Sequence, residues 1–102
     1  MKIIKEDEFD EIISSGICLV DFYADWCGPC KMLGPVLEDL SNDYPDIKFV
    51  KVNCDDSEQL CVRYGILSIP TVFIFKDGQL ISKTTGYQGK DGMKQFIEGA
   101  IK

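Results

Sequence analysis

The chain has 102 residues, of which 45% are hydrophobic and 27% are charged, and its formal net charge is −6. This length suits one domain with a single core, and the composition is that of an ordinary soluble globular protein. The negative charge argues against nucleic acid or an anionic membrane as a main partner, because both repel an acidic surface. No apolar run is long enough to cross a bilayer.

The N-terminal residues and the cysteines bear on the cellular compartment. Residues 1–8 are rich in charged side chains and contain no apolar stretch of signal-peptide length. We therefore expect a cytoplasmic protein, in which structural disulfides are rare and a Cys-x-x-Cys pair is catalytic or metal-binding. The odd number of cysteines, 5, does not indicate a disulfide framework, and the absence of histidine excludes Cys/His nucleophile pairs and mixed Cys/His zinc sites.

Hydrophobic periodicity predicts helices and strands that alternate early in the chain, followed by a hairpin and a last helix. Alternating strands and helices favour parallel pairing and the hairpin is antiparallel, so we expect an α/β layered fold with a mixed sheet, in one domain over residues 1–102. The first predicted helix has its apolar face over 9–13 and follows the acidic residues 6–8, which suit a helix N-terminus. The other predicted elements are a buried strand over 17–23, a helix with its apolar face over 33–44, a strand over 47–53, a short helix between 57 and 65, a strand over 71–75, a tight turn at 77–78 leading into a strand from 80, and a helix over 93–101.

Two cysteines separated by two residues lie in the segment Trp26-Cys27-Gly28-Pro29-Cys30. The segment follows the predicted strand over 17–23 and precedes a helix that we expect to begin near Lys31. At such a junction the free N–H groups and the positive end of the helix dipole favour thiolate, the reactive form of cysteine. This placement indicates redox chemistry rather than passive packing.

A zinc site is the alternative chemistry for these thiols. Tetrahedral zinc commonly needs four ligands, and the sequence has neither a second Cys-x-x-Cys pair nor a histidine. Cys54 and Cys61 supply two further thiols that would complete a four-thiolate site. The tryptophan and the Gly-Pro pair that frame the two cysteines favour redox chemistry over zinc.

Asp21 and Lys51 are charged residues inside runs that otherwise predict buried strands. A carboxylate is costly to bury, so we expect the pKa of Asp21 to be raised. The alternative, an exposed strand edge, is disfavoured by the central position of Asp21 in its apolar run. Lys51 shows the same anomaly in the strand over 47–53.

The segment from Val20 to Lys31 resembles the active-site signature of the thioredoxin family. The resemblance covers nearly the whole chain and implies the thioredoxin fold, an α/β architecture with a central mixed five-stranded sheet flanked by four helices. Four other segments also resemble the family. Pro35 stands inside the second helix, and residues 49–53 match the third strand. Tyr64-Gly65-Ile66 and Ile69-Pro70-Thr71 resemble the loop that carries the family's cis-proline, and Gly86 matches a glycine beside the active site.

The resemblance implies a general protein-disulfide reductase that cycles between a dithiol and a Cys27–Cys30 disulfide. Cys27 would attack the substrate disulfide, and Cys30 would resolve the mixed disulfide that forms. Gly28 and Pro29 would tune the redox pair. Pro29 has no N–H and a fixed φ, which suits the first turn of a helix.

The resemblance also assigns roles to the two anomalous charges and to the surface around the disulfide. Asp21 would lie beneath the disulfide and accept the Cys30 proton through water, with Lys51 as its partner on the adjacent strand; such a pair titrates as a coupled unit. A cis bond between Ile69 and Pro70 would place the Ile69 backbone against the reactive thiol, where it pairs with an extended substrate segment. The expected substrate-binding residues are Trp26, Gly28, Pro29, Ile69, Pro70, Gly86 and Tyr87.

Electrons must come from a partner, because the sequence has no flavin or nucleotide motif. By resemblance a thioredoxin reductase recharges the disulfide, NADPH acts only indirectly through that enzyme, and this chain binds no cofactor. The sequence leaves an NADPH-linked and a ferredoxin-linked reductase both open. The small size and the acidic surface favour a monomer.

Two other functions compete with the reductase. Oxidases and isomerases of the same fold usually carry histidine between the cysteines, and this chain has none. A binding module would stabilise a partner through its apolar surface and would need neither the dithiol nor Asp21.

Three cysteines lie outside the motif. Cys18 belongs to the central strand, where a buried cysteine packs as a small hydrophobic residue. Cys54 and Cys61 stand where the family usually has aliphatic or small apolar residues, and packing is the favoured interpretation for both. A regulatory thiol at Cys54, near the rim of the active surface, is the alternative.

Overall fold

The structure, a computed structural model, describes residues 1–102 and contains one sheet of five strands and four helices. The strands run in the order β1-β3-β2-β4-β5; β2 is parallel to β3 and antiparallel to β4. The predicted α/β fold with a mixed five-stranded sheet is confirmed. The elements are β1 (Lys2–Ile3), α1 (Glu6–Ile13), β2 (Ile17–Tyr23), α2 (Gly28–Ser41), β3 (Ile47–Asn53), α3 (Glu58–Arg63), β4 (Thr71–Lys76), β5 (Gln79–Thr85) and α4 (Lys90–Ile101).

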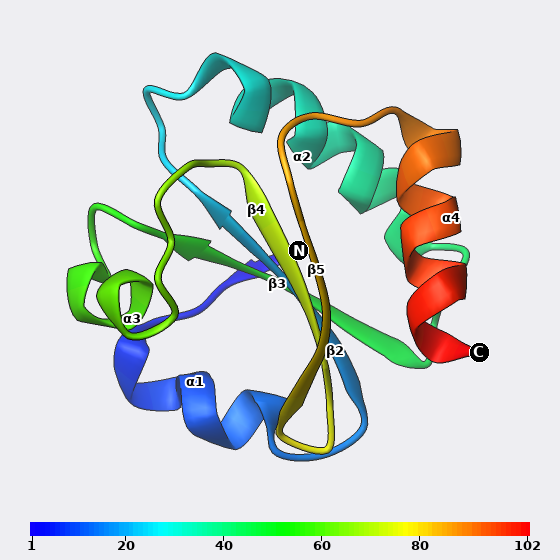
Figure 1. The fold of residues 1–102 in the computed structure, drawn as a ribbon, viewed down its shortest axis with the longest axis horizontal. Coiled ribbons are helices and arrows are strands. Elements are labelled where there is room, and N and C mark those ends of the chain that lie inside the picture. Colours follow the sequence, from blue (N-terminus) through cyan, green and yellow to red (C-terminus); the bar gives the residue numbers. More distant parts are fainter.

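The four helices cover the two faces of the sheet in pairs (Figure 1). On one face α1 and α3 contribute Phe9 and Leu60 to an apolar cluster. On the other face α2 and α4 contribute Leu37 and Met93 to a second cluster. The inner strands β2 and β4 are therefore buried on both faces, whereas β1 and β5 at the edges are largely exposed. None of the helices is both long and apolar enough to span a membrane.

The central strand β2 carries the residues that position the site. Its side chains alternate between the two clusters, so Val20 packs with α1 and α3 while Leu19 packs with α2 and α4. Because β2 is buried on both faces, its sequence is a nearly continuous apolar run rather than an alternation of apolar and polar residues. Its register places Asp21 between Lys51 of β3 and Val72 of β4, in the middle of the sheet.

The predicted boundaries of β2 and β3 are confirmed, whereas two helices begin earlier than predicted. α2 starts at Gly28 instead of near Lys31, because Cys27 already acts as its N-cap. α4 starts before Met93, at Lys90, since periodicity marks only the buried face of a helix and not its polar first turn. The two exposed residues of β1 were not predicted, because so short an edge strand has no alternation to detect.

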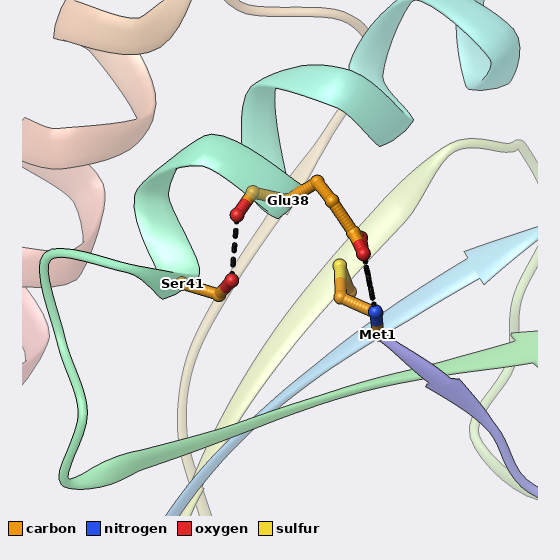
Figure 2. A network of polar contacts seen from close by, with 3 residues as sticks. All are labelled: Met1, Glu38 and Ser41. Carbon is orange, nitrogen blue, oxygen red and sulfur yellow. Dashed lines mark hydrogen bonds and ion pairs between the residues drawn. The ribbon is translucent and has the colours of Figure 1, made fainter.

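An ion pair ties the N-terminus to α2. The Met1 ammonium group contacts both carboxylate oxygens of Glu38, at 2.5 and 2.9 Å, while the Ser41 hydroxyl donates to the Glu38 carbonyl oxygen at 2.6 Å (Figure 2). This contact joins the edge strand β1 to the helix that begins at the cysteine pair.

Leu37 tests how much the fold depends on the packing of α2. Leu37→Ala is expected to lower the free energy of unfolding by about 2–5 kcal/mol, because it removes fully buried methyl groups and leaves a cavity. Met32→Ala, at a position in the same helix that is 58% exposed, is the matched control. It should change the free energy by no more than about 0.5 kcal/mol in urea unfolding. Equal losses in the two variants would contradict the packing described.

Candidate active site

Cys27 and Cys30 form a disulfide where β2 leads into α2, with their Cα atoms 5.2 Å apart. The backbone of Cys27 is extended, which suits an N-cap residue, and its Sγ accepts a hydrogen bond from the backbone N–H of Cys30 at 3.2 Å. After reduction the same N–H group and the helix N-terminus favour a negative charge on the Cys27 sulfur. Each cysteine is only 5% exposed, so a substrate must dock closely to reach it.

The loop before β4 lies against the disulfide. The Ile69–Pro70 peptide bond is cis, and the carbonyl oxygen of Ile69 is 3.7 Å from the Cys27 Sγ. The Pro70 carbonyl accepts a hydrogen bond from the Gly86 N–H at 2.8 Å, which joins the end of β5 to the same loop. Gly86 has φ 87°, a left-handed conformation that favours glycine. The structure thus brings Ile69, Pro70 and Gly86 together beside the cysteine pair, as expected.

Exposed apolar side chains come from the segments that surround the disulfide. Trp26 is 70% exposed and Tyr87 is 44% exposed. Gly28 and Pro29 are exposed in the first turn of α2. Such apolar exposure at a reactive group is typical of a surface that docks a partner.

Two residues of this region were not predicted from the sequence. The Asp55 carboxylate accepts a hydrogen bond from the indole N–H of Trp26 at 2.9 Å and so orients the ring. An acidic residue in a polar turn carries no signal that would reveal this contact. Leu67, in the loop that carries the cis-proline, is 98% exposed. A leucine in an otherwise turn-like loop is a signal that could have been noticed.

Asp21 is buried in the centre of the sheet, with 1% of its surface exposed, and its Oδ1 atom has no hydrogen-bond partner. Burial raises the pKa of its carboxyl group to about 6, and the positive charge of Lys51 offsets part of that effect. The expected rise is therefore present. A carboxyl group with this pKa exchanges its proton in the near-neutral range, as a general acid or base must.

Lys51 lies beside Asp21 in the register of β2 and β3, as expected. The two charged groups do not form an ion pair within 4.0 Å. Instead the Lys51 ammonium group lies 4.2 Å from the centroid of the Tyr23 ring, in a cation–π contact. Lys51 therefore acts on Asp21 at longer range, which is why its effect on the carboxyl pKa is smaller than that of burial.

A cavity of about 450 Å³ opens next to the disulfide. Cys30, Tyr23 and Lys51 contribute to its wall, and Met1 and Glu38, joined by the ion pair of Figure 2, line another part of it. Because liquid water occupies about 30 Å³ per molecule, the cavity has room for several waters. It connects the side of Cys30 with solvent.

The four-thiolate zinc site is not formed. No group of three or more His, Cys, Asp or Glu side chains is arranged to hold a metal ion. The two thiols that would have completed the site, Cys54 and Cys61, contact each other instead.

The thioredoxin family model matches residues 1–99 of the chain. This chain belongs to the thioredoxin family. Two thioredoxins resemble it closely in sequence. One, from Chlamydia muridarum, is 42% identical over 97 residues, which are 95% of each chain. The other, from Staphylococcus saprophyticus, is 43% identical over 101 residues, covering 96% of this chain and 97% of the relative.

A solved structure of Plasmodium falciparum thioredoxin superposes on the chain with a TM-score of 0.92 at 37% sequence identity, covering 97% of this chain and 98% of that one. Thioredoxin-family proteins are protein-disulfide oxidoreductases that act on disulfide substrates and receive their electrons from a reductase partner. This thioredoxin-family chain is accordingly a protein-disulfide reductase, and Cys27 and Cys30 are close enough to form its redox-active disulfide. NADPH enters only through the reductase.

Asp21 should make the stability of the protein depend on pH. Its pKa rises from 3.8 to about 6 on folding, so folding favours the neutral carboxyl group. The stability that this preference contributes at low pH is lost as the pH rises from about 4 through about 6, in total about 2–3 kcal/mol, at about 1.36 kcal/mol for each pKa unit. Asp21→Asn stays neutral, so its stability should increase relative to the wild type over this range. Guanidinium unfolding of both oxidised proteins measures the difference, and parallel pH profiles would contradict the expectation.

Proposed function

We propose that Cys27 is the attacking thiol of this reductase and Cys30 the resolving thiol. The observation that carries the assignment is the N-cap position of Cys27, whose sulfur accepts the Cys30 N–H and lies 3.7 Å from the Ile69 carbonyl oxygen. The Cys27 thiolate attacks a substrate disulfide, forms a mixed disulfide and expels one substrate thiolate. The Cys30 thiolate then attacks the Cys27 sulfur, which closes the Cys27–Cys30 disulfide and releases the second substrate thiolate. Two electrons pass from the dithiol to the substrate.

Asp21 accepts the Cys30 proton through water in this second step. Its raised pKa and its unpartnered Oδ1 atom support the assignment, because a well-satisfied carboxylate would bind protons too weakly. The cavity that Cys30 and Lys51 line does not reach Asp21 itself, but it has room for water on the Cys30 side of the proposed transfer. Lys51 adjusts the proton affinity of Asp21 through its charge.

A substrate segment docks on the apolar surface around the disulfide and pairs in extended form with the backbone of Ile69. The exposure of Trp26 and Tyr87 supports this surface, and Leu67 adds to it. Backbone pairing supplies affinity for many sequences, which suits a general reductase. Besides Leu67, the surface comprises Trp26, Gly28, Pro29, Ile69, Pro70, Gly86 and Tyr87. Gly28 and Pro29 also tune the redox pair.

Residues 1–102 form one domain that works as a monomer in the cytoplasm, with a thioredoxin reductase as its electron donor. The single sheet, which both apolar clusters share, supports one domain. The net charge of −6 supports protein substrates rather than nucleic acid or an anionic membrane as partners.

Single cysteine variants test the order of attack. Cys30→Ser should accumulate a covalent mixed disulfide with an oxidised protein substrate, because the first step proceeds and the second is blocked. Cys27→Ser should form none. Non-reducing electrophoresis and mass spectrometry identify the adduct. Cys18→Ala, which alters a buried free thiol in β2, should reduce the substrate like the wild type. An adduct on Cys27→Ser and none on Cys30→Ser would reverse the two roles.

Asp21→Asn tests the proton acceptor. The rate of protein-disulfide reduction should fall by about tenfold or more, as for other losses of general-base catalysis, while circular dichroism shows the fold retained. Asp25→Asn, which removes an exposed carboxylate from the rim of the same cavity, is the matched control and should keep the rate. A near-normal rate for Asp21→Asn between about pH 6 and 9, around the usual cysteine pKa, would eliminate the assignment.

A further inference from the structure

Cys54 and Cys61 hold their sulfur atoms in direct contact outside the active-site pair. The Cys61 thiol donates a hydrogen bond to the Cys54 sulfur at 2.7 Å. This separation is only about 0.7 Å longer than the bond of about 2.05 Å in a disulfide. Both thiols are free, and no step of the reductase mechanism uses them.

The backbone anchors both residues of this second pair. The Cys54 N–H donates to the Tyr23 carbonyl at 2.8 Å, which ties Cys54 to the end of β2. The Cys61 N–H donates to the Ser57 carbonyl at 3.2 Å, and the Cys61 carbonyl accepts from the Ile66 N–H at 2.9 Å. Because both backbones are fixed and the sulfurs already touch, a small rotation of the side chains is enough to bring the atoms to bonding distance.

The two thiols differ in access, and their mutual hydrogen bond raises the pKa of Cys54 while it lowers that of Cys61. Cys54 is partly exposed at the end of β3, whereas Cys61 is 8% exposed in α3. Burial raises the pKa of both thiols, and the acidic side chain of Asp55 raises it further. Since the thiolate is the nucleophile, we expect this pair to react more slowly at neutral pH than a thiol with an ordinary pKa.

We propose that Cys54 and Cys61 are a second redox pair that closes an intramolecular disulfide when a low-molecular-mass disulfide of the glutathione type oxidises it. The accessible Cys54 sulfur, as thiolate, attacks the small disulfide, forms a mixed disulfide and expels one small thiolate. Cys61 then loses its proton, and its sulfur attacks the Cys54 sulfur and expels the second small thiolate. Two electrons pass to the small disulfide, and the two protons of the pair end on the two released thiols.

Closure of this pair acts on the docking surface through Asp55. Asp55 follows Cys54 directly, and its carboxylate holds the indole of Trp26. Closure converts the Cys54 thiol next to Asp55 into a disulfide sulfur, and we expect this change beside Asp55 to alter its contact with Trp26. The effect on substrate reduction rests on the proposed function, whereas the disulfide itself does not.

Peptide mapping of the wild-type chain tests the pair without any substrate. The reduced protein is incubated with glutathione disulfide, alkylated under denaturing conditions and digested with trypsin, which cleaves after lysine and arginine. Residues 52–63 then carry both Cys54 and Cys61, and residues 6–31 carry Cys18 and the active-site pair. We expect the peptide 52–63 to become unlabelled and lighter by two hydrogen atoms, while Cys18 stays alkylated as an internal control. Two labels on 52–63, a lasting glutathione adduct on Cys54, or a bond between the two peptides would each overturn the proposal.

The single tryptophan reports the coupling to the docking surface. In Cys27→Ser/Cys30→Ser, which removes the active-site dithiol, glutathione disulfide should change the Trp26 fluorescence as the peptide 52–63 becomes oxidised. The matched variant that also carries Cys61→Ala should show no change. Fluorescence that stays constant while the disulfide forms would refute the coupling. Because neither readout involves substrate reduction, a failure of the reductase mechanism would appear only in the cysteine-trapping experiment.

Discussion

The hydrogen bond from the Cys30 N–H to the Cys27 sulfur is the interaction on which the proposed mechanism depends. It exists because a short connection joins β2, the central strand, to α2. The last residue of this connection, Cys27, is the N-cap of the helix. The rest of the fold holds this junction: two apolar clusters fix β2 between its neighbours, and α2 packs on the sheet through fully buried leucines such as Leu37. The packed core thus holds the cysteine pair at the N-terminus of α2, where backbone N–H groups have no partner within the helix.

The buried carboxyl group of Asp21 shows that the site is not optimised for stability. An amide or an apolar residue would avoid the cost of ionising a group in the centre of the sheet. The Lys51 ammonium group sits over the Tyr23 ring, not within ion-pair distance of Asp21, and leaves the carboxyl pKa at about 6. A close ion pair would lower that pKa and make the group a poor base. The longer separation therefore keeps the pKa of Asp21 in the range that its proposed role as proton acceptor requires.

The fold class and the cysteine pair could be predicted because each depends on local patterns: apolar runs for β2 and β3, and two cysteines at a strand-to-helix junction. The cis bond at Pro70 and the place of Gly86 came only through the family resemblance, since residues far apart in sequence decide them. The start of α2 was placed too late because its first turn, Gly28-Pro29-Cys30, has no apolar periodicity. The contacts of Asp55 with Trp26 and of Cys61 with Cys54 could not be predicted, because they depend on how side chains of separate turns meet.

The two cysteine pairs show how the surroundings of a thiol change its tendency to lose a proton. Cys27 has an N–H donor and a helix N-terminus beside it, which stabilise a thiolate. Cys54 and Cys61 lie against an apolar cluster with Asp55 nearby, and both influences favour the neutral thiol. We therefore expect the first pair to react faster than the second, although the sulfurs of the second pair already touch. Proximity permits a disulfide, whereas the fraction of thiolate sets how fast it forms, so the two pairs are expected to respond to oxidants on different timescales.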